Sequence, residues 1–189
     1  RGVGSGLSTG PGLGGYDASL RAAAKGLRSM PDMSAYRPNV GVVVFDRRGR
    51  VWLGRRAGTQ GPYNWQFPQG GVDDGEDLDA AALRELHEET GMSSVTLLAR
   101  TQDWIVYDFP PELLGTPRAR GWSGQKQVWY AFRFIGDDRE IDLAAHDEIE
   151  FDDWRWATMD EAVEAIVPFK RQVYATVAEA FTAFAKPVE

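Results

Sequence analysis

The sequence of 189 residues predicts an α/β fold, in which a mixed β-sheet carries helices on both faces. Strand-like runs rich in β-branched and aromatic residues come first, stop at one amphipathic helical segment, and return after it. A second helical region closes the chain, so that each face of the sheet can be covered. The length and the 43% hydrophobic content suit one domain with extensions.

The first part of the chain reads as an extension. Its opening run, RGVGSGLSTGPGLGG, contains seven glycines and no periodicity, which is typical of a flexible tail. A short helix with one apolar side could follow at residues 17–30. We therefore expect a glycine-rich extension over residues 1–34 and the folded domain over residues 35–186.

A hairpin is expected to open the domain. The β-branched run NVGVVVF at Asn39–Phe45 precedes a turn at Arg47–Gly49 and a second strand at Val51–Gly54. A polar loop at Gly58–Asn64 then leads to a short strand at Trp65–Pro68. The glycines that follow are expected to lie in a loop.

The next segment predicts a helix. Gly75 precedes it, and Leu78, Ala82, Leu86 and Thr90 recur every four residues, which is typical of a buried helical face. Gly91 is the predicted stop.

Strand signals return at Val95–Tyr107, Gln127–Ile135 and Phe151–Ala157. The residues from Thr158 to Glu161 have the spacing of a capping box and predict a helix that runs toward Ile166. Pro168 suits the first turn of a last helix. One side of that helix is expected to carry Phe169, Val173, Val177, Phe181 and Phe184.

Three glutamates of the first helix predict a divalent-cation site. Glu85, Glu88 and Glu89 stand at positions i, i+3 and i+4, so they share one helical face and repel one another. They also lie near the C-terminal end of the helix, where the macrodipole disfavours anions. A solvated acidic face is the alternative; a cation held by hard carboxylate oxygens explains the crowding better.

The residues around these glutamates form a longer motif. Gly70, Glu76, Arg84, the three glutamates, Gly91 and the apolar positions 86 and 92 fit G-x5-E-x7-R-E-U-x-E-E-x-G-U, where U is apolar. Seven fixed letters agree by chance on the order of one time in 10^8 per start position. The segment resembles the signature box of the Nudix hydrolases, and every specified position matches.

The resemblance implies the Nudix α/β/α sandwich with a mixed sheet and a loop-helix-loop catalytic box. It implies a hydrolase that cuts diphosphate bonds with Mg²⁺, or with Mn²⁺ or another divalent cation. In this family the carbonyl of the first glycine, here Gly70, serves as a metal ligand, and the arginine, here Arg84, orients a catalytic glutamate. Glu85, Glu88 and Glu89 are accordingly expected to be both catalytic and metal-binding.

Segments outside the box narrow the resemblance. The runs YRPNVG, WQFPQGG, GQKQ, EFDDWRW and FKR are similar to those of bacterial RNA pyrophosphohydrolases and of plant-type and bacterial diadenosine tetraphosphate hydrolases. The similarity covers about residues 35–184. It implies a substrate that is either a 5′-triphosphorylated RNA end or a dinucleoside polyphosphate. We expect the RNA reaction, removal of pyrophosphate from the 5′ end, with dinucleotide cleavage as the alternative.

The same resemblance implies further site residues. Glu150 is expected to complete metal binding, although alone it would read as a solvated acid at a strand edge. Arg37 is expected to contact phosphate, and Tyr107 and Phe169 to flank a nucleobase, with helix core as the alternative for Phe169. Two lysines and two glutamines complete the expected substrate-binding set, namely Lys126, Lys170, Gln125 and Gln127. His87 and His146 are assigned no catalytic role.

Composition excludes several classes of function. The chain contains no cysteine, which excludes disulfides, zinc–thiolate sites and cysteine nucleophiles. The formal net charge of −7 argues against broad nucleic-acid binding, and we expect no DNA partner. No apolar run is long enough to span a bilayer, so we expect no membrane partner and a cytoplasmic location. A nucleotide-sensing module without activity stays an alternative, as does a nucleotide-sugar or ADP-ribose hydrolase; the intact acidic positions of the box argue against the first.

Overall fold

The computed structural model describes residues 32–188. The glycine-rich run and the short helix expected at residues 17–30 lie outside the described residues, and the domain limits at 34 and 186 stay predictions. Two long strands form the centre of the sheet, β1 (Tyr36–Phe45) and β7 (Gly124–Phe134). They pair in parallel over their whole shared length, from Tyr36 opposite Gly124 to Phe45 opposite Arg133.

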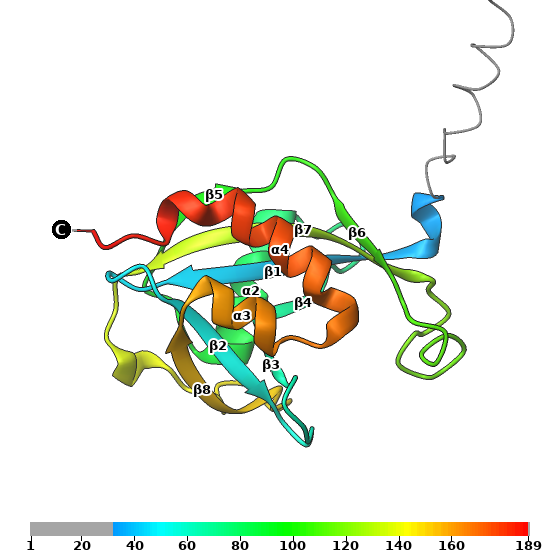
Figure 1. Ribbon diagram of the computed structural model, residues 1–189, viewed down its shortest axis with the longest axis horizontal. Coiled ribbons are helices and arrows are strands. Elements are labelled where there is room, and N and C mark those ends of the chain that lie inside the picture. The colour runs from blue at the N-terminus through cyan, green and yellow to red at the C-terminus, as the bar shows by residue number, and fades with distance from the viewer. Residues whose placement is uncertain (1–31, 189) are drawn as a thin grey trace, which may run out of the picture. The chain divides into compact units, whose positions relative to one another are not determined.

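The remaining strands extend this pair into an eight-stranded mixed sheet, drawn in Figure 1. The main path runs β3-β2-β1-β7-β5, with β2 at Val51–Arg56, β3 at Trp65–Gln66 and β5 at Val95–Arg100. Three strands lie off this path: β4 (Gln69–Gly71) pairs with β1, β6 (Ile105–Asp108) with β7, and β8 (Phe151–Ala157) with β2. All pairings except that of β1 with β7 are antiparallel.

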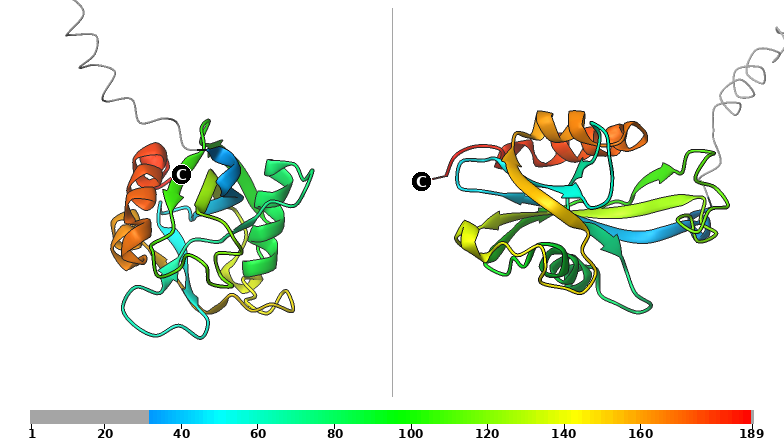
Figure 2. Two further views of the ribbon diagram at one scale, coloured as in Figure 1. Left: turned by 90° about the vertical axis from the view of Figure 1, so that its right-hand side faces the viewer. Right: turned by 90° about the horizontal axis from the view of Figure 1, so that it is seen from below.

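Helices cover both faces of the sheet, as Figure 2 shows from two further directions. One face carries α2 (Leu78–Thr90), and the other carries α3 (Met159–Ala165) and α4 (Arg171–Phe181). The described residues also contain 3-10 turns, at Met33–Ala35, Asp138–Glu140, Pro168–Lys170 and Thr182–Phe184. The predicted α/β/α sandwich is confirmed. No helix within residues 32–188 has the length and apolar character needed to cross a membrane.

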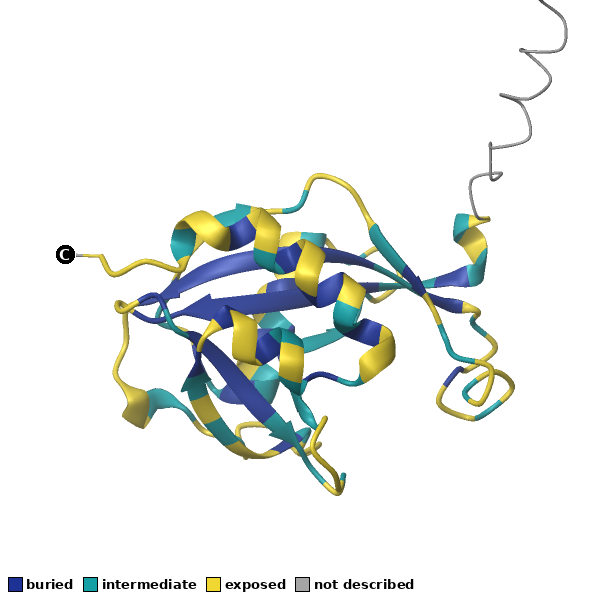
Figure 3. Ribbon diagram, viewed as in Figure 1, coloured by how far each residue is buried: buried dark blue, intermediate teal, exposed yellow. Residues whose placement is uncertain are grey.

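Each face of the sheet has its own hydrophobic core, because side chains alternate across a strand. Val42 and Val44 of β1 pack toward α2, whereas Val43 and Phe45 pack toward α3 and α4. Figure 3 shows the central strands buried along most of their length. A strand buried on both faces reads as a continuous apolar run, which is why this run was recognisable in the sequence.

Several sequence predictions of local structure are confirmed. The hairpin of β1 and β2, the limits of β8 and the buried face of α2 agree with the structure. Thr158 caps α3 in a capping box: its side chain accepts from the Glu161 backbone N–H, and the Glu161 carboxylate accepts from the Thr158 N–H. Gly91 ends α2 in the left-handed conformation with φ 72°.

Three local predictions are wrong. The single strand expected at Val95–Tyr107 is two strands, because the polar run after Arg100 bends the chain between the parts that pair with the two halves of β7. Gly70 and Gly71 lie in β4 rather than in a loop, since they pair with β1. Phe169 does not belong to the buried side of α4; it lies in the preceding 3-10 turn and is 37% exposed.

Candidate active site

A cleft of about 650 Å³ lies beside the first half of β1. It is bounded by β4 and α2, by the loops after β2 and β6, and by the segment that joins α3 to α4. Most of the predicted site residues line it together, namely Arg37, Gly70, Glu85, Glu88, Glu89, Tyr107, Gln125, Glu150, Phe169 and Lys170. The structure therefore gathers residues from both halves of the chain into one space.

Helix α2 presents the glutamates to this cleft. Asp77 caps the helix, since its carboxylate accepts hydrogen bonds from the backbone N–H groups of Asp79 and Ala80. Ala82 and Leu86 are buried against the sheet. This packing fixes the rotation of the helix and turns the glutamates toward β4.

Glu89 is held against the glycine-containing strand. Its Oε2 accepts a hydrogen bond of 3.0 Å from the Gln69 backbone N–H. Burial raises the pKa of Glu89 well above its ordinary value, and the nearby carboxylates of Glu150 and Glu85 raise it further. Three carboxylates that oppose one another's ionisation are therefore near one another in this part of the cleft.

Glu85 is also largely buried, with 9% of the residue exposed. The pKa of its carboxyl group is raised above the ordinary value, because burial outweighs the opposing effect of the hydrogen bond from Arg84. A Cβ placed on Gly70 would overlap the Glu85 carboxylate. Only glycine at this position lets the strand backbone approach the carboxylate so closely.

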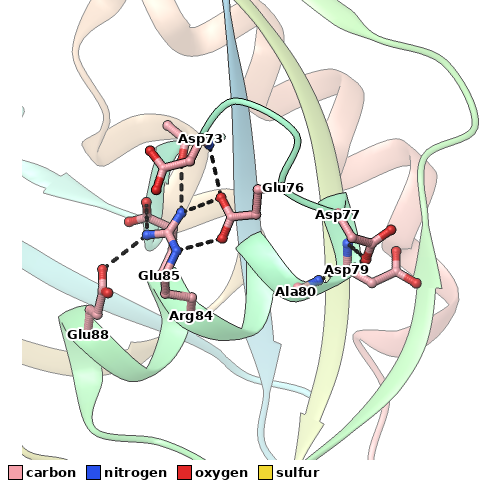
Figure 4. Close-up of polar contacts among 9 residues, drawn as sticks. Asp73, Glu76, Asp77, Asp79, Ala80, Arg84, Glu85 and Glu88 are labelled. Carbon is pink, nitrogen blue, oxygen red and sulfur yellow. Dashed lines mark hydrogen bonds and ion pairs between the residues drawn. The ribbon is translucent and has the colours of Figure 1, made fainter.

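Arg84 organises the supporting side of the site, as Figure 4 shows. Its Nε and Nη2 donate to the two oxygens of Glu76 at 2.7 and 2.8 Å, and Nη2 also donates to the Gly71 carbonyl at 3.0 Å. Its Nη1 donates to Glu85 at 2.8 Å and to Glu88 at 3.1 Å. Although Arg84 directly precedes Glu85, its long side chain reaches that carboxylate, which suits the expected orienting role.

Glu76 acts as the anchor of this network. It lies just before Asp77 rather than inside the helix, and its Oε2 also accepts from the Asp73 backbone N–H at 3.0 Å. Hydrogen bonding to Arg84, followed by that backbone contact, lowers the pKa of Glu76 to about 2. The carboxylate therefore stays ionised and keeps Arg84 in place.

The donor set of the cleft fits a divalent cation, since Glu85, Glu88, Glu89 and Glu150 supply hard carboxylate oxygens. Within residues 32–188 no three acidic or imidazole groups already form a closed ligand cluster. Arg84 bridges Glu85 and Glu88, and Glu150 contacts Arg56 at 3.3 Å. Three of the four carboxylates thus pair with arginines here. A bound cation would relieve the repulsion from Glu150 and Glu85 that contributes to the raised pKa of Glu89.

Aromatic and cationic side chains form another part of the cleft. The ring centroids of Tyr107 and Phe169 lie 6.1 Å apart, and the Lys170 Nζ lies 5.6 Å from the centroid of the Tyr107 ring. The Tyr107 hydroxyl donates to Gln125 at 2.8 Å. Burial, and then the charge of Arg56, lower the pKa of Lys170 to about 8. Phe169 is exposed to the cleft, so the helix-core alternative for this residue is wrong.

Lys126 and Gln127 do not line the cleft. The Lys126 Nζ lies 5.5 Å from the centroid of the Trp104 ring. Gln127 is fully buried below Gln125, donating to it at 3.1 Å and to Asn39 at 2.9 Å, and accepting from the Trp129 indole N–H. Gln127 thus holds Gln125 in position from beneath.

Sequence reasoning missed three arginines that line the cleft: Arg56, Arg118 and Arg120. Strand alternation is the sequence signal that could have found Arg56, because successive residues of a strand point to opposite faces. Its neighbour Arg55 points the other way and pairs with Asp152 and Asp153. The two others belong to the run PRARG between β6 and β7, which stands out in an acidic chain.

Comparisons with known proteins indicate the family of this chain. The model of the NUDIX domain matches residues 35–177. The RNA pyrophosphohydrolase of Caulobacter vibrioides is 64% identical over 156 residues, which is 82% of this chain and 91% of that protein. The RNA pyrophosphohydrolase of Rhizobium meliloti is 50% identical over 157 residues, 78% of this chain and 93% of that protein. The crystal structure of a C. elegans Ap4A hydrolase binary complex shares the fold, with a TM-score of 0.55 and 20% identity over 78% of this chain and 98% of that one.

Proposed function

We propose that this chain, which belongs to the NUDIX hydrolase family, removes pyrophosphate from the 5′ end of triphosphorylated RNA. The main support is the 64% identity to an RNA pyrophosphohydrolase over 82% of this chain and 91% of that protein. The gathering of the box glutamates with Arg37, Tyr107, Phe169 and Lys170 in one cleft supports it. In the reaction, water adds to a phosphorus atom, the bond to the bridging oxygen breaks, and pyrophosphate leaves an RNA with a 5′-monophosphate.

Mg²⁺ is the proposed cation, and it would polarise phosphoryl oxygens and lower the pKa of the attacking water. Glu85, Glu88, Glu89 and Glu150 are the side chains that would hold it, together with the Gly70 carbonyl. Arg84 and Glu76 keep the glutamates oriented through the hydrogen bonds described above.

The other cleft residues bind the substrate in this proposal. Arg37 and Lys170 place positive charge beside the phosphate chain, since both line the same cleft as the glutamates. Phe169 offers an exposed ring to the first bases, where stacking contributes about 1–3 kcal/mol per base. Gln125 adds a polar contact, and a cytoplasmic location stays part of the proposal.

Cleavage of a dinucleoside polyphosphate is the second candidate function. It requires the same bond cleavage and the same glutamates, and the fold is shared with an Ap4A hydrolase. At 20% identity that likeness carries the fold alone. The RNA reaction is favoured because the more similar relatives are RNA pyrophosphohydrolases.

Product analysis tests the proposal. Purified protein with Mg²⁺ and a 5′-triphosphate RNA should release pyrophosphate and leave 5′-monophosphate RNA in equal amounts, and a chelator should stop the reaction. Release of orthophosphate alone would contradict the proposed cleavage. Tight binding of the RNA without any product would favour a nucleotide-sensing module instead.

A further inference from the structure

The loop between β6 and β7 carries two arginines that the proposed reaction has not used. Arg118 and Arg120 are both exposed and both line the cleft. Among the described residues, neither makes a hydrogen bond, an ion pair or a ring contact, whereas Arg37 lies against Gly71 and Arg56 contacts Glu150. Two cations are therefore available to a ligand of the cleft.

The loop that supports these arginines is built from successive hydrogen-bonded turns. Backbone bonds join Leu113 to Pro110, Thr116 to Leu113, and Ala119 to Thr116. The Thr116 hydroxyl donates a further bond to the Leu113 carbonyl at 2.7 Å. Ala119, which separates the two arginines, is buried with 1% of its surface exposed. The arginine side chains thus start from an anchored backbone.

Arg120 occupies a position where arginine is an unfavourable choice. The Trp122 N–H donates to the Ala119 carbonyl at 2.8 Å, and both residues between them have positive φ, 49° at Arg120 and 84° at Gly121. This is the pattern of a type I′ turn, which favours asparagine or glycine at the first central position. Arg120 is the non-glycine residue with positive φ in the described part of the chain. Strain of this kind indicates a functional reason for the side chain.

The loop that carries the two arginines adjoins the aromatic part of the cleft. It continues directly from β6, which carries Tyr107, and Phe109 lines the cleft where the loop begins. In Figure 1 the loop projects beyond the paired ends of β6 and β7. Among the described residues of this loop, Glu112 is the one acidic residue that lines the cleft. The two arginines therefore outnumber the acidic residues that the loop contributes to the lining. The loop that carries the arginines is therefore continuous with the strand that supplies the aromatic residues of the cleft.

We propose that Arg118 and Arg120 form a cationic arm that binds the phosphodiester groups of the RNA beyond its first nucleotide. The inference rests on the proposed function and adds the feature that separates the two candidate substrates. An RNA carries a negative charge at each nucleotide after the triphosphate, whereas a dinucleoside polyphosphate carries all of its charge on the bridge. Cations beyond the first base therefore favour RNA.

The test compares substrates in the full-length protein. The double variant Arg118→Gln/Arg120→Asn removes both charges, and asparagine suits the turn at position 120. We expect the ratio of kcat/KM for a 5′-triphosphate RNA hexamer to kcat/KM for diadenosine tetraphosphate to fall at least tenfold, because each lost contact is a charge-assisted hydrogen bond. The slope of log kcat/KM for RNA against log salt should become shallower by about 1.4, for two phosphates.

Matched variants distinguish the arm from a general charge effect. Arg48→Asn removes the charge of an exposed arginine in the turn that follows β1, outside the cleft, and should leave the ratio unchanged. Arg118→Lys/Arg120→Lys keeps both charges and should recover most of the salt dependence. Thermal melting of each variant checks that the loop change has not unfolded the protein.

The role of Arg118 and Arg120 and the proposed function fail on different results. If the folded double variant keeps the wild-type substrate ratio and salt slope while the wild type cleaves RNA, the RNA-binding role of Arg118 and Arg120 is wrong and the proposed function still holds. If the wild type does not cleave RNA, both the proposed function and the RNA-binding role of the two arginines are wrong.

Discussion

Glu89 combines the features expected of a metal-binding carboxylate. It is held by the Gln69 backbone N–H, and its ionisation is opposed by burial and by two neighbouring carboxylates. Replacing it with glutamine keeps an oxygen that can accept the same hydrogen bond but removes the charge. The contribution of Glu89 can therefore be separated from its packing.

We expect Glu89→Gln to fold normally and to lower kcat on 5′-triphosphate RNA by at least tenfold, because cation binding loses an anionic ligand. Steady-state kinetics with Mg²⁺ measure the effect, and circular dichroism verifies the fold. Glu179→Gln, on the exposed face of α4, is the matched control and should retain wild-type turnover. Wild-type kcat in folded Glu89→Gln would contradict the assignment.

The Glu76–Arg84 pair gives a pH-dependent prediction. Because the pKa of Glu76 is lowered to about 2 in the folded protein, its stabilising effect is complete above the unfolded-state value near 4.5. The effect is lost as pH falls from about 4.5 toward 2. Glu76→Gln should thus reduce the free energy of unfolding by ~1 kcal/mol near pH 7, after allowance for solvent screening.

Urea unfolding at pH 7 and at successively lower pH checks this prediction. The difference between wild type and Glu76→Gln should narrow as the solution becomes more acidic. A difference that is constant between pH 7 and pH 3 would show that the ionised carboxylate is not the source of the stability.

At the scale of elements, β4 and α2 meet at Gly70. An alanine there would place its Cβ onto the Glu85 carboxylate, so either the strand or the glutamate must move. We expect Gly70→Ala to lower kcat/KM by at least tenfold while secondary structure stays intact. Circular dichroism together with kinetics measures this, and a folded Gly70→Ala with full activity would show that the close approach is not needed.

Some elements and site residues were predictable from the sequence, and others were not. Helix α2 and strand β8 were predictable because their patterns are strongly periodic and their ends carry local signals such as Gly91. The site glutamates followed from their spacing on one helix. The residues at 125–127 were less predictable as a group, and only Gln125 of the three lines the cleft. Strand alternation turns Lys126 to the opposite side, whereas Gln127 lies on the same side as Gln125 but is fully buried beneath it.

Loop residues could not be placed from the sequence. Arg118 and Arg120 reach the cleft through a series of turns whose path depends on tertiary contacts, such as the burial of Ala119. Phe169 illustrates the same limit, since its spacing agrees with a buried helical face while the 3-10 turn that begins at Pro168 leaves it exposed. Helical periodicity holds only where the helix itself is continuous.

At the scale of the whole domain, α4 is hydrogen-bonded to the connection between β3 and β4, which leads into the active site. The Tyr174 hydroxyl accepts a hydrogen bond of 2.9 Å from the backbone N–H of Phe67, and the two rings stack with centroids 4.8 Å apart. Both residues are fully buried. This contact links the core beneath α3 and α4 to the strands that carry Gly70.

Tyr174→Phe keeps the ring but leaves the buried Phe67 N–H without an acceptor. We expect the free energy of unfolding to fall by about 1–3 kcal/mol, which is the cost of an unsatisfied buried donor. Tyr63→Phe removes the hydroxyl of an exposed tyrosine and should change stability by less than about 0.5 kcal/mol. Equal effects of the two substitutions in urea unfolding would contradict the role given to this hydrogen bond.

The central claim is that this cleft acts on the 5′ end of RNA. It is tested most directly by measuring kcat/KM on a short 5′-triphosphate RNA and on diadenosine tetraphosphate, in parallel, at the same Mg²⁺ concentration, with Glu89→Gln as the blank. The proposed function predicts a value for RNA at least tenfold above that for the dinucleotide. A preference of similar size for the dinucleotide would contradict it and would make dinucleoside polyphosphates the substrate class.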